Sequence, residues 1–343
     1  MLQKTIFREH APYVAVIMVF LSFAIPLILL YYLHADSFTE SWKGRTFYLF
    51  FIWLFVLEVI LNWEKYRNDT AIRLYTKVRS FFFGVFLFLP TVYVIVSDFL
   101  GLNEIILDFS RQFNVEWISW MPLSIEYLVF AALFAGIVLL AYGLRGLADF
   151  SLSTAILGAI GAIYMIDNLY PYGLFTPFQI FVPTTAMLAA NVLNFMGYQT
   201  RLIINSSMPL LQVWNSEGGA QFRIAWPCSG VQSLLIYTLT ILLFLKKTDI
   251  SWIQRGVYLF VGAIVTYFIN ALRIVSIFVI AANGGDYLLF HDYYGELYSM
   301  TWIVSYPLVV IGSRVFWAKM KLRLNTGNLM RKSFYRPTQV QDS

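Results

Sequence analysis

The sequence predicts an all-α polytopic membrane protein, and two features of its composition carry that prediction. Of the 343 residues, 59% are hydrophobic and only 13% are charged, whereas a soluble domain of ordinary composition carries about 25% charged residues. The apolar residues are gathered in stretches long enough to cross a hydrocarbon core of about 30 Å, which takes about 20 helical residues. The chain between these stretches is too short for a soluble domain of useful size.

About eight apolar stretches are expected to be transmembrane helices. In chain order they are 11–33, 46–63, 80–100, 122–143, 150–167, 229–246, 255–282 and 296–317. The first is too long for the hydrophobic region of a cleavable signal peptide, so we expect it to be a true span. The chain therefore divides into four parts. These are the N-terminal spans in 1–167, an external segment at 168–227, a three-span core at 228–318 and a basic tail at 319–343.

The charges of the loops predict the orientation, because Lys and Arg accumulate in short cytoplasmic loops. The loop 64–79 carries five basic residues and the tail is basic, so both are expected to be cytoplasmic. The loop 98–121 is mostly acidic and 283–295 has no Lys or Arg, so both are expected outside. We therefore expect a multi-pass protein of the cell membrane with both termini in the cytoplasm. The net charge of +5 lies mostly in loops and tail, which indicates membrane topology and not a nucleic-acid partner.

A ninth apolar segment, 177–196, is predicted to lie at the outer membrane interface instead of spanning. Nine spans would place the basic tail outside, against its charge. On a helix, Thr184, Asn191 and Asn194 share one face, with Leu188, Val192 and Phe195 turned away from it, as in an interfacial helix. The rest of the external segment is predicted to form turns and short strands, with a hairpin turn at Gly218-Gly219.

The only cysteine, Cys228, lies where the external segment meets the span 229–246. With one cysteine the chain forms no intramolecular disulfide. Pro227 suits the start of a helix, and the free N–H groups and dipole of a helix start stabilise a thiolate, the nucleophilic form of the side chain. The alternative is a small packing residue, which is the common role of a lone buried cysteine.

Two further residues are expected on the same side of the membrane as Cys228. Arg273 lies nine residues before the outer end of 255–282, about 13 Å deep. A charge at that depth needs a partner or a wet cavity, and Thr266 and Asn270 on its face indicate a polar pocket, although a snorkelling or structurally paired Arg stays open. His291 follows in the next outer loop and could equally be a surface residue. Together, thiol, guanidinium and imidazole could supply a nucleophile, an oxyanion donor and an acid–base group.

Three short motifs resemble those of the exosortase/archaeosortase family, over about 170–317. They are Cys228-Ser229-Gly230, Asn270-Ala271-Leu272-Arg273, and His291 with Gly295. Members are membrane cysteine transpeptidases. They cleave the C-terminal sorting signal of secreted surface proteins, made of a short motif, a transmembrane helix and a basic cluster. They form a thioester and transfer the protein to an acceptor, a membrane lipid. The chain is interpreted as an archaeal-type member.

The resemblance implies a role for each matching residue. Cys228 would be the nucleophile, Arg273 would stabilise charge on the thiolate or oxyanion, and His291 would be the general acid and base. Ser229, Gly230 and Asn270 would support them, and no cofactor or metal is implied. The Trp-Pro pair before the cysteine departs from the small or acidic residue of many relatives and is interpreted as a matter of substrate fit.

The principal alternative is a polytopic transporter with a functional intramembrane arginine, Arg273. The sequence has no repeated halves and no matching pair of broken helices, which argues against it. A third hypothesis is an acyltransferase-like enzyme or a structural assembly factor. A transporter predicts that Cys228→Ser keeps function, whereas a transpeptidase predicts that it does not.

Overall fold

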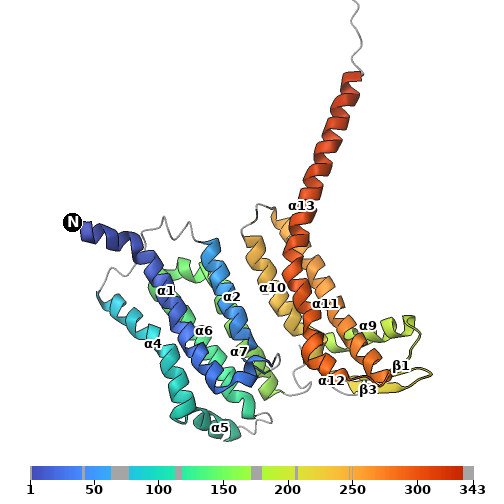
Figure 1. Ribbon diagram of the computed structural model, residues 1–343, viewed down its shortest axis with the longest axis horizontal. Coiled ribbons are helices and arrows are strands. Elements are labelled where there is room, and N and C mark those ends of the chain that lie inside the picture. Colours follow the sequence, from blue (N-terminus) through green and yellow to red (C-terminus); the bar gives the residue numbers. More distant parts are fainter. Residues whose placement is uncertain are drawn as a thin grey trace, which may run out of the picture.

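The long helices of the chain stand in two neighbouring groups with a small β-sheet at one end (Figure 1). They are seen in a computed structural model. It describes residues 2–40, 43–62, 77–112, 118–170, 180–204, 208–246, 248 and 250–334. The predicted all-α membrane architecture is confirmed, and the sheet is confined to the predicted external segment.

The first group consists of the five helices predicted up to residue 167. They are α1 Leu2–Leu33, α2 Thr46–Leu61, α4 Lys77–Phe99, α6 Met121–Asp149 and α7 Ser151–Leu169. Aromatic side chains fill the space between them. The ring of Phe23 meets those of Phe51, Phe130 and Phe134 edge to face, with centroids 5.4 to 5.8 Å apart, a favoured geometry for aromatic pairs. In α6, Gly143 has φ +73°, which interrupts the helix at the residue where the predicted span ends.

The second group consists of α10 Val231–Lys246, α11 Trp252–Ala282 and α13 Gly295–Phe334, which match the three-span core. A capping box formed by Ser251 and Gln254 begins α11. Between α11 and α13 the chain forms a short helix, α12 Tyr287–Leu289, followed by a π-helical turn at Phe290–Tyr294. The sequence had indicated only a loop there.

Helix α9, Phe181–Phe195, belongs to the external segment and lies across the long axes of α10 and α11 (Figure 1). Its buried face consists mainly of small residues such as Ala186 and Ala189, while Thr184, Asn191 and Asn194 are exposed, as predicted. Phe195 is 93% exposed. Positions 177–179 of the predicted helix lie outside the described residues.

Three strands follow: β1 Gln199–Ile203, β2 Leu210–Trp214 and β3 Gly219–Arg223. They form an antiparallel sheet in the order β1-β2-β3. The hairpin between β2 and β3 turns at 215–218, where the Asn215 side chain accepts hydrogen bonds from the N–H groups of Glu217 and Gly218. The hairpin predicted at Gly218-Gly219 is confirmed.

Helix α5, Leu102–Gln112, was not expected from the sequence. It lies in the loop predicted to be external and is amphipathic. Ile105 and Phe109 are exposed, and Glu104, Asp108 and Arg111 share the helix with them. Such a helix suits a membrane–water boundary.

Five helices are long and apolar enough to cross a membrane by length and composition: α1, α4, α6, α7 and α11. Helices α2, α9 and α10 and the part Thr301–Trp317 of α13 are shorter apolar helices. The chain is thus a multi-pass membrane protein, and the number of eight spans stays a prediction. Successive helices run in opposite directions, so the loops predicted to be external share one end of the molecule with the sheet (Figure 1). That this end faces outward is a prediction from the loop charges.

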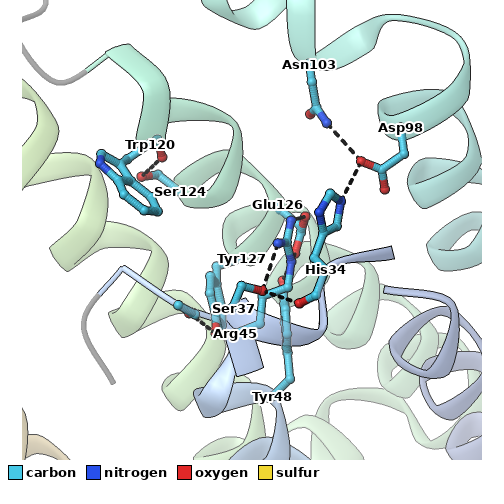
Figure 2. Close-up of polar contacts among 11 residues, drawn as sticks. His34, Ser37, Arg45, Tyr48, Asp98, Asn103, Trp120, Ser124, Glu126 and Tyr127 are labelled. Carbon is cyan, nitrogen blue, oxygen red and sulfur yellow. Dashed lines mark hydrogen bonds and ion pairs between the residues drawn. The ribbon is translucent and has the colours of Figure 1, made fainter. Parts of the chain in front are cut away.

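At this end, a network of charged residues fastens the chain between α1 and α2 to the bundle (Figure 2). Arg45 donates to both carboxylate oxygens of Glu126 at 2.9 and 2.7 Å, and the Tyr48 hydroxyl donates to the same carboxylate at 3.0 Å. Burial alone lowers the pKa of Arg45, but the carboxylate of Glu126 more than offsets this, and the net pKa is raised. His34 is bonded to Asp98 at 3.1 Å in the same region. The neighbouring Lys43 pairs with Asp167 of α7 within the same group.

Candidate active site

Cys228 lies in a 3-10 turn, Trp226–Ser229, at the sheet end of the molecule. Its N–H donates to the carbonyl of Ala225 at 3.0 Å, which closes the turn. Gly230 then has φ +91°, a left-handed conformation that redirects the chain, and α10 begins at Val231. The thiol thus precedes the helix by one turn, where the sequence had indicated a helix opening directly at the cysteine. The side chain of Cys228 is half-buried.

Asn270 of α11 holds this turn in place. Its Nδ2 donates to the carbonyl oxygen of Cys228 at 2.8 Å. Its amide also lies against Gly230, where a Cβ atom would meet the Asn270 Cγ at 2.9 Å. Position 230 therefore requires glycine for two reasons: its left-handed backbone conformation and the close approach of Asn270.

Ser229 closes the turn and does not face outward. It is fully buried, and its Oγ donates to the carbonyl of Trp226 at 2.6 Å. The Ser229 carbonyl lies 3.2 Å from the hydroxyl of Thr185 on α9, and that hydroxyl lies 2.7 Å from the hydroxyl of Tyr267 on α11. Ser229 thereby connects the turn to α9 and α11.

Trp226 connects the cysteine turn to the first helix group. Its indole N–H donates to Asp167 Oδ1 at 2.7 Å, and Asp167 Oδ2 pairs with the Lys43 ammonium at 2.8 Å. Trp226, Asp167 and Lys43 are 2%, 7% and 6% exposed. The interpretation of the Trp-Pro pair as a substrate-fitting feature therefore fails for Trp226, because its indole is buried and bonded inside the protein.

Arg273 contacts the segment that carries His291. Its Nη2 donates to the backbone carbonyl of His291 at 3.4 Å. A Cβ atom at Gly295 would lie 2.7 Å from Arg273 Nε, so the guanidinium passes directly over that glycine. His291 belongs to the π-helical turn Phe290–Tyr294, and single π-helical turns occur frequently at functional sites. The segment after α11 thus folds back onto Arg273, and Arg273 and His291 are both half-buried.

Helix α11 brings the two halves of the site together. Asn270 and Arg273 are three residues apart and therefore lie on one face, less than one turn from each other. The first binds the turn of Cys228 and the second binds the turn of His291. The three motifs that are far apart in the sequence therefore meet on one stretch of one helix.

Thr266, expected in the same polar pocket, serves helix packing. Its hydroxyl donates to the carbonyl of Gly262 and accepts from the Trp302 indole at 3.1 Å. Together with the contact between Arg273 and Gly295, this fixes how α11 and α13 pass each other. Ser299 lies between these contacts at the level of Asn270. It is 4% exposed, and its hydroxyl has no hydrogen-bond partner among the described residues.

Sequence reasoning did not single out Lys43, Asp167, Thr185 or Ser299. An acidic residue such as Asp167 at the end of an apolar span was a usable signal, because a charge there requires a partner. Thr185 and Ser299 gave no such signal, because hydroxyl side chains are common in membrane helices. Within the described ranges, no group of three or more His, Cys, Asp or Glu side chains is placed to hold a metal ion.

The fold and this site define a multi-pass membrane protein whose single cysteine lies in a turn before α10, bonded to the same helix that carries Arg273. A protein-family model described as "Transmembrane exosortase (Exosortase_EpsH)" matches residues 42–308. The match covers well over half of the chain, so the chain belongs to the transmembrane exosortase family. No curated protein and no solved structure matches it. Membership makes this a membrane transpeptidase that acts on sorting signals of secreted proteins, and it favours the transpeptidase over the transporter.

Proposed function

We propose that the chain cleaves the C-terminal sorting signal of secreted surface proteins with Cys228 as nucleophile, and transfers them to a membrane lipid. The observation that carries this proposal is the pair of bonds from α11, one from Asn270 to Cys228 and one from Arg273 to His291. They hold a thiol, a cation and an imidazole-bearing turn on neighbouring parts of one helix. These are the groups that thioester chemistry requires.

In the first half of the reaction, the thiol proton passes to His291 and the thiolate sulfur attacks the carbonyl carbon next to the recognition motif. The electron pair of the carbonyl moves to oxygen, and Arg273 stabilises that oxyanion. When the intermediate collapses, the C–N bond breaks and His291 gives its proton to the leaving amine. The signal's helix departs, and the processed protein remains on Cys228 as a thioester.

In the second half, an amine of a membrane lipid attacks the thioester. His291 takes the proton of that amine, the new C–N bond forms, and the C–S bond breaks to return the thiolate. A lipid amine is a suitable acceptor because the proposed nucleophile lies at a membrane surface. The product is a surface protein joined to a lipid anchor.

The substrate's own transmembrane helix has to lie in the bilayer beside the protein. An apolar cleft of about 260 Å³ lies between the two helix groups, a volume that fits individual side chains of that helix and not the helix itself. It is lined by Leu49, Phe50, Trp53, Thr240, Ile303 and Val304. The loop charges support an active site at the outer face, where a secreted substrate carries its recognition motif.

Co-expression with a secreted protein that ends in a motif, a helix and a basic cluster tests the proposal. Wild type is expected to remove the helix, detected by mass, and to carry a hydroxylamine-sensitive adduct on Cys228. Cys228→Ser and Cys228→Ala are expected to abolish both signals. The matched control is Ser305→Ala, because Ser305 bonds only to carbonyls of its own helix. Cleavage that survives Cys228→Ser would overturn the assignment of the nucleophile.

A further inference from the structure

Strand β3 leads directly into the turn of Cys228, and no strand among the described residues pairs with its outer edge. The Ile224 N–H donates to the carbonyl oxygen of Pro209, and the Asn215 N–H donates to the carbonyl oxygen of Gly218, both at 2.9 Å. These bonds fix the alternation of the hairpin, because hydrogen-bonded pairs occur at every second position of an antiparallel ladder. The register of the two strands therefore directs the backbone N–H and C=O groups of Ala220 and Phe222 toward β2. The backbone N–H and C=O groups of Gly219, Gln221 and Arg223 point away from it.

These outward groups have no hydrogen-bond partner among the described residues. All three residues are exposed. Helix α11 covers a face of the sheet: the Phe222 ring packs on Phe278 with centroids 5.1 Å apart, and Leu211 and Val213 join the same buried cluster. A row of unpaired groups of this kind is a template for another strand.

The position of this edge relates it to the proposed nucleophile. Arg223 lies five residues before Cys228, a span of at most about 17 Å for extended chain. The backbone continues extended through Ala225, with φ −85° and ψ 160°. A chain that pairs with β3 is therefore guided toward the thiol. Strand β1 has an equivalent open edge at Thr200 and Leu202, but it follows α9 and does not lead to the cysteine.

We infer that the β3 edge binds the segment of the substrate around the scissile bond as an added β-strand. The inference rests on the proposed function and names how its substrate is held. Only another polypeptide backbone supplies donors and acceptors at the spacing that the edge leaves unpaired. The three strands include Arg201 and Arg223, both exposed, and no Asp or Glu. The added strand is therefore a segment of neutral or acidic side chains, and the basic cluster of the signal binds elsewhere.

Gln221→Pro in the full chain tests this edge, because proline removes one outward N–H and leaves the bonds to β2 in place. We expect cleavage of the co-expressed signal to fall at least 10-fold. Gln221→Val keeps the N–H and loses the side-chain bond to Gln212, so it measures the loss due to the side chain, and we expect it to cleave several-fold faster than Gln221→Pro. Thr200→Pro removes the corresponding outward N–H of β1, and we expect it to cleave within two-fold of wild type. The thermal midpoint of each variant shows whether it folds.

A second test changes only the substrate. Synthetic signals that carry one backbone N-methyl group each are presented to wild type in lipid vesicles. Loss of cleavage is expected at alternate residues next to the scissile bond, since only every second N–H faces β3. A uniform response, or normal cleavage by Gln221→Pro, would overturn the inference. If the inference is overturned in this way while Cys228→Ser is inactive, the proposed function still stands. Cleavage that survives Cys228→Ser overturns the function, and this inference with it.

Discussion

The side-chain amide of Asn270 donates a hydrogen bond to the carbonyl oxygen of Cys228 at 2.8 Å. Asn270 is 1% exposed and belongs to the middle of α11. Because the bond goes to the backbone of the cysteine, it positions the turn and leaves the thiol free to react. The location of the proposed nucleophile therefore depends on a helix that begins 24 residues after it.

Asn270→Ala should reduce cleavage about 100-fold, because a displacement of about 1 Å at a reacting group costs a factor of that size. It also leaves the Cys228 carbonyl without its buried donor, which lowers the free energy of unfolding by about 1–3 kcal/mol. Cleavage rate and thermal midpoint measure the two effects. Asn283→Ala, directly after the same helix, removes exposed side-chain bonds to Asn215 and Tyr198; as the control it should change cleavage and thermal midpoint much less. Wild-type cleavage by Asn270→Ala would show that the bond is dispensable.

Gly230→Ala should destabilise the protein by at least about 1–2 kcal/mol, because the left-handed φ of +91° strains any side chain. The added Cβ would also lie 2.9 Å from Asn270 Cγ. Gly256→Ala is the matched control on α11. Its Cβ meets nothing within 4 Å, and alanine is the better helix former by about 1 kcal/mol. Thermal unfolding in detergent compares the two, and equal midpoints would contradict the expected strain at 230.

The long apolar helices could be predicted from the sequence because each is specified by its own residues. Hydropathy and length identify α11, and a three-residue spacing places Asn270 and Arg273 on one face without reference to the rest of the chain. The spans alternate in direction because each loop joins two helix ends on the same side of the membrane. The hairpin could also be predicted from its own residues, because the glycines at 218 and 219 mark the turn.

The contacts that build the site could not be predicted in this way. Trp226, Asp167 and Lys43 come from three separate segments, and nothing in their local sequences selects these partners. The left-handed Gly230 and the π-helical turn at Phe290–Tyr294 are imposed by packing on α11. Helix α5 was missed because a short amphipathic helix has too little apolar length to be found by hydropathy.

Gly295→Ala should reduce cleavage at least 10-fold with little loss of stability. Gly295 has an ordinary helical φ of −58°, so alanine causes no backbone strain. Its Cβ would lie 2.7 Å from Arg273 Nε, which forces the guanidinium away from the His291 carbonyl. Gly312→Ala on the same helix meets nothing within 4 Å and is the control. If Gly295→Ala cleaves at the wild-type rate, the position of the guanidinium does not matter to the reaction.

Asp167→Asn should lower the free energy of unfolding by about 3 kcal/mol, since it removes the carboxylate from a buried ion pair. Lys43→Met in the same background removes the cation and should recover most of that loss, as a double-mutant cycle measures. Trp226→Phe loses the hydrogen bond to Asp167 and part of a buried ring, which together cost about 2–3 kcal/mol. The exposed pair of Asp108 with Arg111 offers the control, and Asp108→Asn should cost less than about 1 kcal/mol.

The same variants separate stability from positioning at the cysteine turn. Trp226→Phe keeps the ion pair between Asp167 and Lys43 but disconnects it from the turn, so cleavage should fall further than the loss of stability explains. Asp108→Asn should leave cleavage unchanged. If Trp226→Phe cleaves normally while Asp167→Asn is destabilised, the three buried residues only join the helix groups. The turn of Cys228 would then be positioned by Asn270 of α11 alone.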